Sequence, residues 1–440
     1  MELMNRDFLM LPKDLAATSE SVFKQDPKLV AAINKLYGRN EEDNLNSVIV
    51  LPDRKLNFEE VQKLLNKSSK DTEKIPSTYL QERSNIRKEL IKNIEKTLEK
   101  LNNSADSGDT PMLLLRNQRL WSNCVYDLDR VTLKAFADAK KTTLSYSNRE
   151  DKTRFNAVVF VLTKVHELLL KNLSVTRREL FYQNVTRLRN QANLDVAVRD
   201  VCCLLQTPPW NLGIMATAKG LIAGHIQLQL RDGSCVDCFG AGGTLVPQDI
   251  DGIKEFKSTA KYILVVEKDA IFQKLLDEGA LVRLGPLIIL TGKGYPDVCT
   301  RQLLCRLVNE LRLKALALVD ADPHGYEIFL TYKYGSLAQS HLSQTLACSS
   351  LQLLGARHGD VMTLATREAR LNLTELDKRK IASLLKRPYL NTSTGSLIKK
   401  DLQEMLESGV KAEIEALSPT AAALCDFYLP SKLMQGNYLG

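Results

Sequence analysis

Residues 315–322 read ALALVDAD, an apolar run that ends in two aspartates, and this run is the strongest indication of the fold in the sequence. Two similar apolar runs precede it, YILVVE at 262–267 and LIILTG at 287–292. Segments with helical periodicity, AIFQKLLDE and RQLLCRLVNEL, lie between the three runs. Short, near-continuous apolar strands that alternate with helices are typical of a buried parallel sheet. The sequence therefore predicts an α/β domain in which helices flank a parallel sheet.

Acidic residues follow the first and the third of these runs. Glu267 ends the first, while Asp320 and Asp322 end the third, where strand alternation would turn both side chains to the same side. Ligands of parallel sheets gather beyond the carboxyl ends of the strands, and carboxylate oxygens suit magnesium. The alternative is that such acids cap helices or pair with lysines. The strand-end position of Glu267, which matches that of the aspartates, favours a metal site.

The region 111–250 has a different pattern, with helices followed by a hairpin. Apolar periodicity predicts helices at 154–173 and at about 195–206, and another that begins at Thr176, where Thr176 and Glu179 fit a capping box. The run HIQLQLRDGSCVDCF then alternates apolar and polar residues around Asp232-Gly233, which predicts a β-hairpin. Helices followed by a hairpin favour a winged-helix DNA-binding domain.

The first 110 residues are polar and rich in lysine and glutamate, and we expect a helical N-terminal extension there. One apolar stripe runs along 78–101, after which NNSADSGDTP is typical of a linker. The stripe either packs within its own domain or holds a partner helix, and the first alternative is favoured. The expected domains are therefore the extension at 1–110, the winged-helix domain at 111–250, and the α/β domain with a helical C-terminal part at 251–440.

Composition permits several functions without selecting one. The formal net charge of +8 is compatible with a polyanionic partner but does not require one. There is no apolar run of about 18 residues, so no membrane-spanning helix is expected, and the N-terminal residues lack the pattern of a secretory signal. The nine scattered cysteines are then expected to be reduced thiols. The single CxxC, Cys235 to Cys238, has no second pair nearby, so we expect no zinc site.

The motifs around the acids resemble a known family. VVEKDA at 265–270 and LVDADPHG at 318–325 resemble a Toprim domain, the magnesium module of topoisomerases and primases. TGKGYPD at 291–297 and VDADPHGYEIFLTYKYGS at 319–336 extend the resemblance to the topoisomerase VI A-subunit (type IIB topoisomerase) family, over about 150–440. The residues in these motifs are most similar to those of the meiotic double-strand-break proteins of that family. The resemblance implies a DNA-cleaving transesterase with a 5Y-CAP-like winged helix and with Mg2+ held by the three acids.

The resemblance also selects one of the 13 tyrosines. The family's active-site segment reads Arg-Asp-aliphatic-aromatic-Tyr and matches residues 178–182, with Glu179 in place of the aspartate. It implies that Tyr182 is the nucleophile. Arg178 lies one helical turn earlier on the same face, where a guanidinium could clamp the scissile phosphate. Without the family, the expectation for a helical tyrosine after Leu-Phe is core packing.

Two basic loops are candidate DNA contacts. Lys219, before Gly220, matches a Lys-Gly pair that the family uses on DNA. Gly292, Lys293 and Gly294 follow the second strand, where the glycines would let the backbone approach a phosphate and the lysine would neutralise its charge.

The expected partners are double-stranded DNA, a second copy of the chain and a topoisomerase VI B-like subunit. A dimer is expected because two strands need two tyrosines, and the B-like subunit because the sequence has no P-loop for ATP. The meiotic resemblance implies a nuclear, chromosomal location, with no membrane. Three alternatives stay open: a topoisomerase VI A-subunit that relaxes DNA with an ATPase B-subunit, a non-catalytic DNA-binding scaffold, and a metal-dependent nuclease that uses water.

Overall fold

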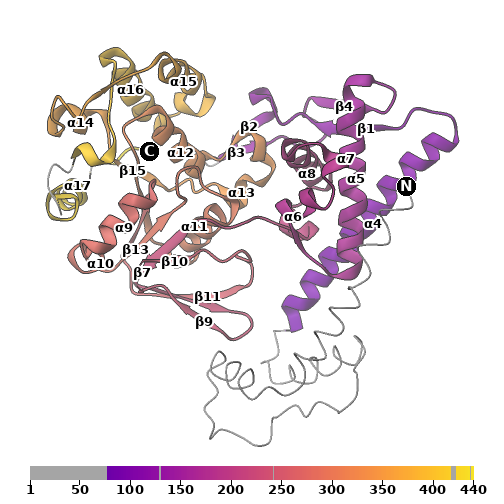
Figure 1. Ribbon diagram of the computed structural model, residues 1–440, viewed down its shortest axis with the longest axis horizontal. Coiled ribbons are helices and arrows are strands. Elements are labelled where there is room, and N and C mark those ends of the chain that lie inside the picture. The colour runs from indigo at the N-terminus through magenta and orange to yellow at the C-terminus, as the bar shows by residue number, and fades with distance from the viewer. Residues whose placement is uncertain (1–76, 128–129, 241, 418–422, 437) are drawn as a thin grey trace, which may run out of the picture. The chain divides into compact units, whose positions relative to one another are not determined.

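The structure is a computed structural model that describes residues 77–127, 130–240, 242–417, 423–436 and 438–440 (Figure 1). These residues belong to one compact unit. Most of the predicted N-terminal extension lies outside the described residues. Of this region the structure describes the helix α4 (Ser77–Asp106), which continues through the first half of the stretch expected to be a linker. None of the helices in the described ranges is both long and apolar enough to span a membrane.

A six-stranded mixed sheet forms the centre of the C-terminal part. The three predicted strands are parallel neighbours, with β12 between β13 and β14, so the prediction of a parallel sheet is confirmed. A fourth parallel strand, β15, which the sequence did not reveal, pairs with β14. At the other edge β7 pairs antiparallel with β13, and β10 pairs antiparallel with β7. In spatial order the strands are β10 (Thr244–Leu245), β7 (Leu221–Gly224), β13 (Leu287–Thr291), β12 (Tyr262–Val266), β14 (Lys314–Leu318) and β15 (Gln352–Gly355).

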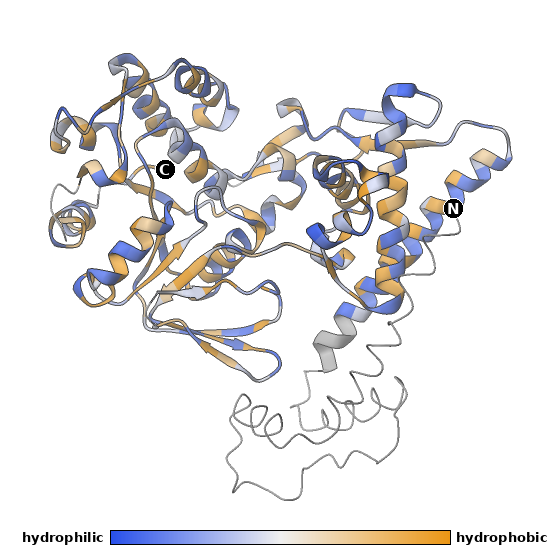
Figure 2. Cartoon of the chain, viewed as in Figure 1, coloured by the Kyte–Doolittle hydropathy of each residue, from blue (hydrophilic) through white to orange (hydrophobic). Residues whose placement is uncertain are grey.

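Both faces of this sheet are buried, which explains its nearly continuous apolar strands. Ile263 and Val265 of β12 pack in one core with α11 (Val298–Leu311) and α12 (Pro323–Tyr334). Leu264 and Val266 pack in the other with α9 (Asp269–Asp277) and the C-terminal residues. Figure 1 shows α9 and α11 on opposite sides of the sheet, and Figure 2 shows its strands as mainly hydrophobic.

A third core holds the helices before the sheet. Apolar residues of α5 and α8 fill it together with those of the antiparallel pair β1–β4. The α4 stripe contributes Leu90, Ile94 and Leu101 to the same core, so it packs within its own chain, as favoured from the sequence. The elements are β1 (Met112–Arg116), β2 (Cys124–Asp127), β3 (Arg130–Leu133), β4 (Lys141–Ser145), α5 (Arg149–Lys171), β5 (Val175–Thr176), α6 (Arg177–Tyr182), α7 (Val185–Leu188), α8 (Gln191–Leu205) and β6 (Ile214–Met215).

The predicted hairpin forms, but it belongs to another part of the fold. Strands β8 (Ile226–Leu230) and β9 (Cys235–Asp237) pair antiparallel, and β11 (Ile253–Ser258) pairs with the free edge of β8. Ile226 and Leu228 pack in the core that contains α11, not in the core of α5 and α8. The hairpin is therefore joined to the sheet rather than to the helices, and the winged-helix interpretation stays a prediction.

The remaining elements of the C-terminal part are mostly helical, in line with their sequence pattern. They are α10 (Ala280–Arg283), α13 (Ser343–Leu346), α14 (His358–Leu364), β16 (Leu371–Asn372), α15 (Glu375–Leu385), α16 (Ser393–Ser408), β17 (Val410–Lys411) and α17 (Leu429–Gln435).

Candidate active site

Tyr182 is the last residue of the short helix α6, and its side chain is 71% exposed. The helix starts with the predicted capping box: the Glu179 N–H donates to Thr176 Oγ1 over 3.1 Å, and the Thr176 N–H donates to Glu179 Oε2 over 3.4 Å. Both contacts satisfy amides that the helix leaves unpaired. Leu180 alone of the helix is buried, so Tyr182 does not pack in the core.

Arg178 is exposed and lies one turn before Tyr182 on α6. In the part of the chain that the structure describes, its guanidinium has no hydrogen-bond acceptor and no carboxylate partner. The neighbouring Arg177 is held instead, by Asp195 of α8 over 3.4 Å. The structure therefore places an exposed guanidinium beside an exposed phenol, the pair that the sequence selected.

The acids lie at the carboxyl ends of β12 and β14, as expected. Glu267 follows β12 directly and is buried, and its Oε2 accepts the Asp320 N–H over 2.8 Å. Strand β14 ends at Leu318, earlier than predicted, so strand alternation does not set the direction of Asp320 and Asp322. Asp320 is buried in the loop that follows β14, and Asp322 is the N-cap of α12.

Each of the three carboxylates is held by a backbone amide. Glu267 has the Asp320 N–H, Asp320 Oδ1 accepts the Ile414 N–H over 2.9 Å, and Asp322 Oδ1 accepts the Gly325 N–H over 2.7 Å. The contact at Asp322 is the helix cap that the alternative explanation expected. As the side chains lie, no group of three or more acids, histidines or cysteines within the described ranges is close enough to hold a metal ion.

Lys268 was missed from the sequence, although it directly follows Glu267. Its Nζ lies 3.1 Å from Asp320 Oδ2, 3.1 Å from Glu413 Oε2 and 2.9 Å from Glu415 Oε2. Burial opposes its charge, but these carboxylates outweigh that effect and raise its pKa. Nothing in the sequence linked Glu413 and Glu415 to this site, because only the fold brings them there.

Glycine is required at the turn between the acids. A Cβ on Gly325 would lie 2.4 Å from the backbone oxygen of Asp320 and 2.9 Å from Glu267 Oε2. Any side chain there would push the Asp320 loop away from Glu267. The glycine of the PHG motif is therefore a packing requirement of the acidic site.

The electrostatics of the site fit a divalent cation. Burial, and next the charge of Asp320, raise the pKa of Glu267 to about 8. Burial likewise raises the pKa of Asp320 to about 6, although the Ile414 amide and Lys268 oppose this. Even with Lys268 beside Asp320, the negative charges of these two buried carboxyls are not fully compensated. Carboxylate oxygens are the ligands that magnesium prefers.

The two basic loops lie side by side. Lys219 Nζ donates to the backbone oxygen of Lys293 over 3.1 Å, and Lys293 Nζ pairs with Asp269 over 3.0 Å. Asp297 Oδ2 accepts the N–H groups of both Lys219 and Gly220 over 3.2 Å. Gly292 is fixed by packing, since a Cβ there would lie 2.6 Å from the Tyr332 hydroxyl, while Gly294 has a φ of +85°. Whether these loops contact DNA stays a prediction.

Replacing Glu267 by glutamine should stabilise the metal-free protein as the pH rises. The pKa of this carboxyl is raised from 4.5 to about 8, so the free energy of unfolding falls as the pH rises through that interval. Glutamine keeps an oxygen for the Asp320 amide but carries no charge. We expect Tm of E267Q minus Tm of the unsubstituted chain to grow by several degrees between these pH values, measured by thermal unfolding in EDTA.

The matched control is Glu255→Gln, which removes an exposed carboxyl from β11. Its Tm should follow that of the unsubstituted chain across the same pH range. A difference for E267Q that does not change with pH would contradict the raised pKa of Glu267.

Family models of known proteins match both the segment that contains Tyr182 and the segment that contains the three acids. The family model for the Toprim domain of Spo11 and of the topoisomerase 6 A-subunit matches residues 262–433, which include all three acids. The model for type IIB DNA topoisomerase matches residues 153–214, which include Arg178 and Tyr182. The predicted Toprim domain is thereby confirmed.

Similar proteins match over most of the chain. The meiotic recombination protein SPO11 of Mus musculus is 34% identical over 354 residues, 80% of this chain and 89% of that protein. The meiotic recombination protein W68 of Drosophila melanogaster is 36% identical, over 67% of this chain and 87% of its own length. The DNA topoisomerase 6 A-subunit of Arabidopsis thaliana is 35% identical, over 73% of this chain and 75% of its own length. The chain therefore belongs to the Spo11 and topoisomerase VI A-subunit family of type IIB DNA topoisomerases.

Proposed function

We propose that this chain makes double-strand breaks in DNA for meiotic recombination, by transesterification with Tyr182 as the nucleophile. The observation that carries the proposal is the 71% exposed Tyr182 beside Arg178, whose guanidinium has no partner among the described residues, within the segment that matches the type IIB topoisomerase model. The SPO11 protein of Mus musculus matches a larger share of the chain than the topoisomerase 6 A-subunit does, which favours the meiotic function over DNA relaxation.

The reaction conserves the number of phosphoester bonds. The phenolic oxygen of Tyr182 attacks a phosphorus of the DNA backbone and gives up its proton, and the bond from phosphorus to the 3′ oxygen breaks. The 3′ oxygen takes up a proton, and the 5′ phosphate stays on the tyrosine. Arg178 would stabilise the negative charge that develops on the phosphate, for which a planar guanidinium is suited.

Toprim domains typically bind metal ions such as Mg2+, and in this chain Glu267, Asp320 and Asp322 would hold one. A bound magnesium ion would offset charge on the DNA phosphate. The backbone amides that hold one oxygen of each carboxylate orient the group in advance. Lys268 supports the buried Asp320 from the other side.

The proposed partners follow from the chemistry. Double-stranded DNA is the substrate, and a second copy of the chain supplies the tyrosine for the other strand. From the relatives' names we propose a nuclear, chromosomal location and a topoisomerase VI B-like subunit. Residues 111–250, with Tyr182, are proposed to act as the winged-helix DNA-binding domain, and 251–440 as the metal-binding domain, to whose sheet residues 111–250 contribute β7 and β10.

The test is to digest the protein on cleaved DNA and to sequence the peptide that remains on the break ends. A peptide of α6 linked through Tyr182 to a 5′ end, opposite a free 3′ hydroxyl, is the expected result. Breaks with free 5′ phosphates and no peptide would replace the proposal with a water-using nuclease. Binding without any break, with magnesium and the B-like partner present, would favour the scaffold.

Lys219 and Lys293 are expected to contact DNA phosphates. Replacing either by glutamine should weaken binding to all duplex sequences alike and lower the slope of log K against log salt by about one. Fluorescence anisotropy over a range of salt concentrations measures this. Lys88→Gln, which removes an exposed lysine of α4, is the control and should leave the slope unchanged. A change in base preference would instead mean that these lysines contact base edges.

A further inference from the structure

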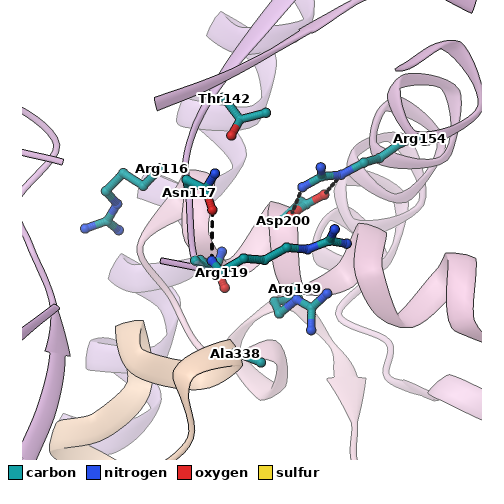
Figure 3. Close-up of a pocket in the computed structure, with 9 residues that line it drawn as sticks. Arg116, Asn117, Arg119, Thr142, Arg154, Arg199, Asp200 and Ala338 are labelled. Carbon is teal, nitrogen blue, oxygen red and sulfur yellow. Dashed lines mark hydrogen bonds and ion pairs between the residues drawn. The ribbon is translucent and has the colours of Figure 1, made fainter. Parts of the chain in front are cut away.

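A cavity of about 200 Å3 is lined by no residue of the Tyr182 helix and by none of the three acids (Figure 3). Its wall comes from the end of β1 and the segment after it, from β4, α5 and α8, and from Ala338 in the helical turn at Leu337–Leu342. The lining residues are Arg116, Asn117, Gln118, Arg119, Thr142, Arg154, Arg199, Asp200 and Ala338. The cavity is thus built from parts of the chain that are far apart in sequence.

The cavity wall carries a large excess of positive charge. Four arginines line it against one carboxylate, that of Asp200, which is an excess of three positive charges among the lining residues. Asp200 is already occupied, because Arg154 donates to its two oxygens over 2.7 and 2.9 Å. The Arg116 guanidinium donates hydrogen bonds to neutral acceptors, the backbone oxygens of Lys134 and Cys203.

The other two guanidiniums have no partner at all among the described residues. Neither Arg119 nor Arg199 donates a side-chain hydrogen bond or pairs with a carboxylate there, although Arg199 is half-buried. Figure 3 shows the Arg119 side chain running between the Arg154–Asp200 pair and Arg199. Burial lowers the pKa of Arg199, and the charges of Arg119 and Arg154 add to this, against the opposing effects of Asp200 and Asp195.

The positive charge of the cavity arginines also affects a nearby histidine, His341. Burial, and next the charges of Arg116 and Arg199, lower the pKa of His341 to about 4. Both ring nitrogens of His341 are buried and have no hydrogen-bond partner within the described ranges. An anion in the cavity would relieve the repulsion that these groups share.

We infer that this cavity binds a phosphate group through Arg119 and Arg199, as a site separate from the one proposed for cleavage. Guanidiniums match the oxygens of phosphate in fixed geometry, and a phosphate offers more acceptor oxygens than a carboxylate does to two separate arginines. Thr142 and the amides of Asn117 and Gln118 add neutral polar groups to the wall. The phosphate comes either from a free anion, such as inorganic phosphate or pyrophosphate, or from the DNA backbone.

Titration calorimetry on the full chain tests the first source, with inorganic phosphate and pyrophosphate as probes and acetate for comparison. Saturable binding is expected for the phosphates, and Arg119→Gln and Arg199→Gln should each weaken it about tenfold. Arg149→Gln is the matched control, since it removes an exposed arginine of α5 outside the cavity. Arg119 is itself exposed, so R119Q decides the outcome should R199Q fail to fold.

Duplex binding over a range of salt concentrations tests the second source. If the phosphate belongs to DNA, R119Q should lower the salt slope by about one while R149Q does not. If it belongs to a free anion, R119Q should bind duplex as R149Q does and lose affinity only for the phosphate probes. Each result supports the phosphate site and identifies its source. R119Q and R199Q that match R149Q in both experiments would overturn it, as would acetate binding as tightly as phosphate.

Discussion

Tyr182→Phe should abolish covalent attachment of the protein to DNA, with a loss of at least about a thousandfold in the rate of cleavage. The phenylalanine ring keeps the contact with the Phe181 ring, whose centre lies 5.6 Å away, and removes only the nucleophilic oxygen. Because Tyr182 is 71% exposed, the free energy of unfolding should change by no more than about 0.5 kcal/mol. DNA affinity should survive, since the lysines and arginines are unchanged.

Covalent adducts on labelled duplex, resolved under denaturing conditions, measure the loss. Tyr146→Phe is the matched control, because Tyr146 is also exposed and packs against Phe155 in the same part of the fold. Its adducts should equal those of the unsubstituted chain. Adducts that persist in Y182F would assign the nucleophile to another tyrosine.

Dimers that mix Y182F chains with E267Q chains should nick one strand, whereas each homodimer should be inactive. Tyr182 lies on a helix whose buried residue packs in the core of α5 and α8, while Glu267 lies beyond the sheet. Within the described residues no hydrogen bond joins the two groups. The family resemblance implies that one chain's tyrosine works with its neighbour's acids, so the E267Q tyrosine meets the intact acids of the Y182F chain.

Two affinity tags allow the mixed dimer to be isolated, and the covalent link should then be found on the E267Q chain alone. If each chain used its own acids, every site in the mixed dimer would carry one lesion, and no nick would form. A verified mixed dimer without nicking would therefore reject the shared site. A mixture of Y182F with the unsubstituted chain provides the positive control for one-strand cleavage.

Local signals in the sequence predicted local structure well. The capping box at Thr176 and Glu179 forms because its contacts lie within one helical turn. The apolar runs became parallel strands because burial on both faces demands their composition. The hairpin at Asp232-Gly233 forms for an equally local reason, a tight turn between alternating strands.

Contacts between distant segments were not predictable. Periodicity shows that Ile226 faces a core, but not which core, so the hairpin was assigned to the helices rather than to the sheet. The end of β14 at Leu318 was missed because residues 319–322, VDAD, alternate apolar and polar side chains as a strand would. Glu413 and Glu415 reach Lys268 from about 145 residues away, and no spacing rule covers such a distance.

The carboxylate of Asp297 ties the loop of Lys219 to the loop of Lys293, and this has a consequence for how DNA is held. The same side chain also caps α11, so both loops are anchored to one helix. If the two lysines contact DNA as proposed, the spacing between the phosphates they hold is set by the protein and does not follow the sequence of the duplex. A duplex whose natural curvature departs from that spacing must bend to fit. Sites of cleavage would then be selected by how easily the DNA deforms rather than by its bases.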